Sequence, residues 1–167
     1  MMKMTEMLLR DAAAVRALAE AWLWDFGTVD DAATEVLEDV GSRCAVVDLG
    51  GAPGGLISSL AEMLDESALP GPATRAVLRR YEPGDYTPAH RFRDEAAGTG
   101  TGWTVLCALD DSDLDALTHW DGERFTRTFD RCGVALRLQP EWWCWTSPVR
   151  GGVRHTLAIG GDQLWTN

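Results

Sequence analysis

Residues 133–149, GVALRLQPEWWCWTSPV, combine two short strand-like segments with a turn that contains proline. Apolar side chains occupy alternate positions of the first segment, GVALRL, as expected of a half-buried strand. The second segment, WWCWT, is apolar except for its final threonine, and a period of two puts Trp142 and Cys144 on one face of it. The stretch therefore predicts two neighbouring strands of a β-structure, with a cysteine on one strand.

The rest of the chain divides into a helical part and a strand-rich part. Further segments of short, β-rich character are residues 75–81, 103–109, 123–129 and 153–159. Residues before them predict a first helix, with Leu8 and Val15 on its apolar face, a helix at 29–40, a strand at 44–49 and a helix near 55–66. Helices followed by antiparallel strands indicate an α+β fold. We expect one domain, 1–167, in which a helical support region (1–70) packs on the outer face of a β-barrel core (74–160).

Composition restricts the partners. The formal net charge of -11 argues against nucleic acid and against anionic membrane surfaces. No apolar run approaches the ~18 residues that span a bilayer. The four cysteines are scattered without a C-x-x-C pair, so a disulfide framework or a zinc finger is not expected. We therefore expect a cytoplasmic protein with a small-molecule partner, and exposed tryptophans would indicate a homodimer.

Three histidines are the candidates for chemistry. His90 follows the turn signal PGD and begins an extended segment, where a metal site would need a second ligand at i+2. That position is Phe92, which cannot bind a metal. His119, in THWDG, is predicted to lie at a surface turn.

The order of motifs along residues 74–160 resembles a known family. The stretches YEPGDYTPAHRF, WTVLCAL, HWDGERF, GVALRLQPEWWCWTSPV and GGVRHTL follow one another as in iron(II)/2-oxoglutarate oxygenases of the prolyl-hydroxylase type. The resemblance covers about half of the chain. It implies a double-stranded β-helix, a jelly-roll or cupin-like barrel.

The same resemblance implies a degenerate metal site. His90 matches the first metal histidine, whereas Phe92 stands in place of the carboxylate and Cys144 in place of the second histidine. Arg154 matches the arginine that holds the far carboxylate of 2-oxoglutarate, and Thr156 matches its serine neighbour. Two of the three metal ligands are therefore missing from this pattern, and His90 is the only ligand that it retains.

Strand alternation agrees with this assignment. If Arg154 and Thr156 point into the barrel, then Val153, His155, Leu157 and Ile159 point outward beneath the helices. The residues expected to bind substrate are Tyr81, Phe92, Trp103, Trp142, Cys144 and Thr156. Aromatic walls with one arginine suit an apolar ligand that carries an anionic or carbonyl group. The alternative is that these rings only fill a small barrel.

Three functions remain open. In the first, the barrel has lost its metal and needs no cofactor. His90 acts as acid or base and Arg154 stabilises a substrate oxygen. The reaction is then cyclisation, isomerisation or elimination on an apolar, natural-product-like substrate. In the second, the chain is an atypical oxygenase that uses Fe(II) and 2-oxoglutarate, with His90 as one ligand. In the third, it binds a small molecule without catalysis.

Overall fold

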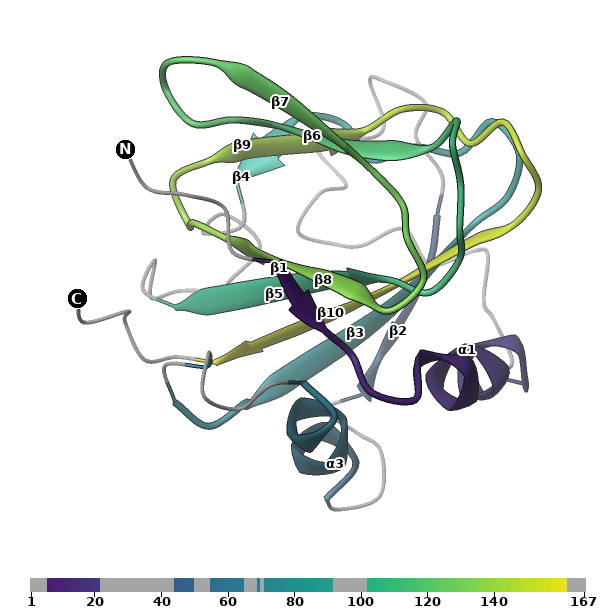
Figure 1. Cartoon of the computed structure of the whole chain (residues 1–167), viewed down its shortest axis with the longest axis vertical. Coiled ribbons are helices and arrows are strands. Elements are labelled where there is room, and N and C mark those ends of the chain that lie inside the picture. Colours follow the sequence, from purple (N-terminus) through teal and green to yellow (C-terminus); the bar gives the residue numbers. More distant parts are fainter. Residues whose placement is uncertain are drawn as a thin grey trace.

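Two antiparallel sheets face each other in the computed structural model, which describes residues 6–21, 44–49, 55–64, 69, 71–91 and 102–161 (Figure 1). The six-stranded sheet has the order β1 (Glu6–Leu8), β8 (Val134–Leu138), β5 (Trp103–Ala108), β10 (Arg154–Gly161), β3 (Arg75–Tyr81), β2 (Ala45–Asp48). The four-stranded sheet has the order β4 (His90–Arg91), β9 (Trp143–Thr146), β6 (Ala116–Trp120), β7 (Phe125–Phe129).

The chain passes repeatedly from one sheet to the other. β3 lies in the larger sheet, β4 in the smaller, β5 in the larger, β6 and β7 in the smaller, and β8, β9 and β10 alternate again. All pairings that involve these strands are antiparallel. This winding is that of a jelly roll, so the predicted α+β double-stranded β-helix is confirmed.

The outer core lies between the larger sheet and the helices. Helices α1 (Ala12–Ala21) and α3 (Leu56–Glu62) cover the side of the larger sheet that faces away from the smaller one (Figure 1). Leu157 and Ile159 of β10 are buried there in one cluster with Val15 of α1 and Leu60 of α3. The predicted outward direction of Leu157 and Ile159 is therefore confirmed.

The inner core lies between the two sheets. It gathers apolar side chains from both: Leu106, Leu117, Leu136, Leu138, Trp142, Cys144 and Ala158. Ala158 has the same parity on β10 as Arg154 and Thr156, so these two side chains also face the interior. This face of β10 positions the site described below.

Several expectations about single elements were wrong. Leu8 belongs to strand β1, and the first helix begins only at Ala12. Residues 116–120, expected to form a surface turn at His119, form strand β6. The expected helix at 29–40 lies outside the described residues.

None of the helices in the described part is long and apolar enough to cross a membrane.

Candidate ligand site between the sheets

Arg154 lies at the start of β10 with 3% of its surface exposed. Its Nε donates to Oδ2 of Asp130 over 2.5 Å, and its Nη2 donates to Oδ1 over 3.0 Å. Asp130 directly follows β7 and is itself buried. Burial raises the pKa of the Asp130 carboxyl, and the hydrogen bonds from Arg154 oppose that rise. Two donors of the buried guanidinium are thus engaged by a carboxylate of the same chain.

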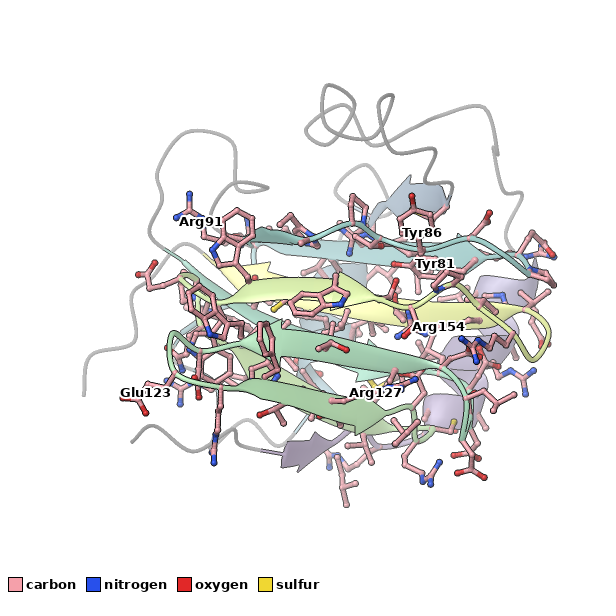
Figure 2. All side chains as sticks on the ribbon, turned by 90° about the horizontal axis from the view of Figure 1, so that it is seen from above. Tyr81, Tyr86, Arg91, Glu123, Arg127 and Arg154 are labelled. Carbon is pink, nitrogen blue, oxygen red and sulfur yellow. The ribbon has the colours of Figure 1, made fainter. Side chains whose placement is uncertain are left out.

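Tyr81 completes the surroundings of Arg154. The two residues are directly opposite on β3 and β10, and the guanidinium carbon lies 5.1 Å from the centre of the tyrosine ring. Figure 2 shows both side chains at the same end of the sheets, away from Arg91. The Tyr81 hydroxyl is 2.8 Å from the Thr87 hydroxyl, and burial raises the pKa of Tyr81. The ring therefore covers one face of the arginine and holds it in place.

A small cavity of about 20 Å³ adjoins this pair. Arg154, Thr156 and Asp130 line it together with apolar residues such as Leu106 and Leu117. Such a volume has room for one water molecule or one ligand oxygen. Nη1 of Arg154 and the Thr156 hydroxyl are buried and have no hydrogen-bond partner among the described residues. Both can donate a hydrogen bond, so the site suits an oxygen acceptor.

His90 lies in the opposite sheet, at the start of β4, and is half-buried. Its Nδ1 is 2.8 Å from the carbonyl oxygen of Pro88. A carbonyl only accepts, so Nδ1 carries the proton and the neutral ring is basic at Nε2. The backbone contact thereby fixes which nitrogen of His90 can take a proton.

Two more reactive side chains continue a row across the smaller sheet. Cys144 on β9 is directly opposite His90, and His119 on β6 is directly opposite Cys144. Directly opposite residues of antiparallel strands point to the same face, so all three lie on the inner side. Cys144 is fully buried, which agrees with its expected inward direction.

His119 was not recognised as an interior residue. It is 2% exposed, and its ring stacks on Trp142 at 4.6 Å between centroids and an interplanar angle of 9°. Burial lowers the pKa of His119, and Nδ1 has no hydrogen-bond partner within the described ranges. The signal was present in the sequence, because Leu117 and His119 share a parity and Leu117 is apolar.

The other expected site residues fall into three groups. Trp142, Cys144 and Thr156 lie in the interior or line the cavity. Trp103 does not: it is fully buried in the outer cluster with the helices, so the expectation that it contacts a ligand in the barrel was wrong. Phe92 lies outside the described residues.

The outer face holds the third histidine. His155 Nδ1 is 3.1 Å from Oδ2 of Asp110, on the helix side of β10. The expectation that it faces outward therefore agrees with the structure. Its neighbour Val153 is more exposed than expected, at 36%.

Solved structures with a similar fold include iron(II)/2-oxoglutarate oxygenases. An oxidoreductase of the 2OG-Fe(II) oxygenase family from Burkholderia pseudomallei matches with a TM-score of 0.64 and 11% identity over 96% of this chain and 87% of that one. A prolyl-4-hydroxylase from Pseudomonas putida matches with a TM-score of 0.63 and 13% identity over 96% and 92% of the two chains.

A third similar structure has a different described activity. The non-heme alpha-ketoglutarate-dependent epimerase SnoN of nogalamycin biosynthesis matches with a TM-score of 0.64 and 16% identity over 95% of this chain and 77% of that one. Neither a family model nor a curated protein sequence matches the chain. The likeness thus concerns the fold, a 2-oxoglutarate-oxygenase-type double-stranded β-helix.

The described residues do not fit the iron site that this fold implies. A non-haem iron(II) site of this type uses two histidines and a carboxylate on one side of the metal. Here the residue opposite His90 is the thiol of Cys144, and the inward carboxylate of Asp130 is bound by Arg154. Within residues 6–21, 44–49, 55–64, 71–91 and 102–161 no three His, Cys, Asp or Glu side chains are placed to hold one ion.

Proposed function

We propose that this chain is a small-molecule enzyme for non-redox proton transfer, built on an oxygenase-type barrel without the metal. His90 is the acid–base residue of this proposal. The observation that carries it is the Nδ1 contact with Pro88, which makes Nε2 the basic nitrogen of a half-buried imidazole on the inner face. Histidine titrates near neutral pH, so it can both take and return a proton.

Arg154 and Thr156 supply the second half of the chemistry. Their unused donors line a cavity with room for a single oxygen atom. A substrate carbonyl oxygen placed there would accept hydrogen bonds that strengthen as negative charge develops on it. His90 does not line this cavity, so the substrate would have to extend from the cavity to His90. There His90 would remove a proton from a carbon that the carbonyl group acidifies, which gives an enolate. Return of that proton to another carbon is an isomerisation, whereas ring closure or loss of a leaving group gives cyclisation or elimination.

Two similar structures make such chemistry reasonable on this fold. SnoN is described as an epimerase and SnoK as a carbocyclase of the same biosynthesis, and both are described as alpha-ketoglutarate dependent. For this chain we infer an apolar, carbonyl-bearing substrate, with proton transfer in place of alpha-ketoglutarate-dependent chemistry.

The test uses an apolar ketone with acidic neighbouring protons, 2-tetralone, in deuterated buffer. Binding is followed by tryptophan fluorescence, and loss of the proton signals beside the carbonyl is followed by NMR. We expect the wild-type protein to accelerate exchange, and His90→Gln to abolish the acceleration while keeping most of the binding. His119→Gln, in the same interior row, is the matched control and should keep the exchange rate within about threefold.

The alternatives give different results. Binding without exchange in either protein would make the chain a carrier or sensor of small molecules. Exchange that is unaffected in His90→Gln would contradict the role of His90. Consumption of 2-oxoglutarate that requires iron(II) would refute the non-redox proposal in favour of an atypical oxygenase.

A further inference from the structure

We infer that Asp130 is a built-in counter-carboxylate that occupies the place where this barrel would anchor a dicarboxylate co-substrate. As a result, the folded protein does not bind 2-oxoglutarate at Arg154, and the remaining donors select a neutral oxygen. This inference does not depend on the role of His90, because its readout is ligand binding and not turnover.

The geometry of the pair is that of a bound carboxylate. Arg154 uses Nε and Nη2, two donors on one edge of the guanidinium, toward the two oxygens of Asp130 at 2.5 and 3.0 Å. This two-point arrangement is how arginine recognises a ligand carboxylate. One face of the guanidinium plane is covered by Tyr81. An incoming carboxylate would find only Nη1 available on the described side of the site.

Charge and burial make the exchange of one carboxylate for another unfavourable. The side chains of Arg154 and Asp130 are 3% and 5% exposed. A free dicarboxylate that displaced Asp130 would leave that carboxylate buried without its cation, and a buried unpaired charge is strongly disfavoured. Asp130 is also part of the same chain, so it competes at a high effective concentration.

The space beside the pair leads to the same conclusion. The cavity of about 20 Å³ has room for one water-sized group, so it admits a single oxygen atom of a ligand and not the two oxygens of a carboxylate. Its unused donors are Nη1 of Arg154 and the hydroxyl of Thr156. A single carbonyl or hydroxyl oxygen of a neutral ligand fits this small volume and can accept hydrogen bonds from these donors. It also brings no second negative charge beside Asp130.

The experiment compares the full-length wild type with Asp130→Ala, which removes the internal carboxylate. Binding of 2-oxoglutarate at up to about 1 mM, the upper end of ordinary KM values, is measured by calorimetry with and without iron(II). Thermal unfolding is measured in sodium acetate and in sodium chloride at equal ionic strength. Asp113→Ala is the matched control, because Asp113 pairs with Arg131 on the surface, where the two side chains are 86% and 52% exposed.

We expect the wild type to show no saturable 2-oxoglutarate binding and no acetate-specific stabilisation. Asp130→Ala should lose stability in chloride and regain it in acetate along a saturable curve, because acetate enters the vacated position. Its apparent acetate affinity should exceed that of the wild type by about tenfold or more. Asp113→Ala should behave as the wild type.

Two results would overturn the inference. One is saturable binding of 2-oxoglutarate by the wild type, with or without iron(II). The other is an Asp130→Ala protein that is as stable as the wild type and indifferent to acetate. If Asp130→Ala folds in neither salt, Asp130→Asn replaces it, because the amide keeps the shape and removes the charge. The wild-type titration decides the central claim in either case.

Discussion

Asp110 links helix α1 to strand β10, and its contacts predict by how much its removal lowers the free energy of unfolding. Its Oδ2 accepts hydrogen bonds from the backbone N–H of His155 at 2.6 Å and from His155 Nδ1, which lies at 3.1 Å. Its Oδ1 is 2.8 Å from Nε of Arg16 on α1. One carboxylate therefore joins the support helix, the loop after β5 and the outer face of β10.

The three contacts do not contribute equally. A hydrogen bond to a charged group is worth about 1.5–3 kcal/mol. The Arg16 side chain is 46% exposed, so that ion pair adds only about 0–1 kcal/mol. Asp110→Ala also leaves the buried N–H of His155 without its acceptor, and we expect it to lower the free energy of unfolding by about 2–4 kcal/mol. Arg16→Ala should cost less than about 1 kcal/mol.

The assay is urea unfolding followed by tryptophan fluorescence, repeated over a range of pH. Burial alone would raise the pKa of Asp110, but the hydrogen bonds and charge of His155, together with Arg16, lower it below its usual value. Because the folded pKa is below the unfolded one, the contribution is complete above about pH 4 and is lost as the pH falls through the folded pKa. Asp110→Asn should lack this acid-dependent loss. An Asp110→Ala protein within about 0.5 kcal/mol of the wild type would refute the reasoning.

Three further predictions concern other parts of the molecule. Burial lowers the pKa of His119. The stability that its neutral ring contributes is therefore complete above about pH 6.5 and falls as the pH drops toward the folded pKa. His119→Phe should remove this pH dependence in unfolding followed by the fluorescence of Trp142. A methyl group at Gly161 would meet Pro72 O at 2.4 Å, so Gly161→Ala should cost about 1–3 kcal/mol in urea unfolding, whereas Gly151→Ala, with its nearest contact at 3.9 Å, should be neutral. The expected homodimer would use the exposed aromatic face of the smaller sheet, where Phe125 is 70% exposed. Phe125→Ser should then shift the sedimentation coefficient toward that of the monomer. An unchanged sedimentation coefficient would contradict this prediction.

The directions of the β10 side chains were predicted from the resemblance and the period of a strand together. Residues 154–156 are polar and residues 157–159 are apolar, so their polarity alone does not show which side faces inward. The resemblance put Arg154 inside the barrel, and the period of two then put Leu157 outside, as observed. Trp103 shows where this reasoning fails. Residues 103–109 are apolar at nearly every position, because both faces of β5 are buried, and no polar residue marks the outer face.

The pair formed by Arg154 and Asp130 could not be read from the sequence for a different reason. The two residues are 24 positions apart and belong to different layers, so only the tertiary structure brings them together. The motif resemblance predicted the inward direction of Arg154 but gave no indication that Asp130 lies beside it. The sequence thus predicted the cation of the site and not the anion that neutralises it.

The position of β10 has a consequence for the order of folding. β10 is the last of the described strands along the chain, yet it lies between β3 and β5 and pairs with both. While a chain is being synthesised, β3 and β5 therefore present unpaired edges until residues 154–161 have left the ribosome. Residue 75 meets residue 160 across this gap, a long loop to close, which slows folding. The strand that carries Arg154 is thus also the one that completes the larger sheet.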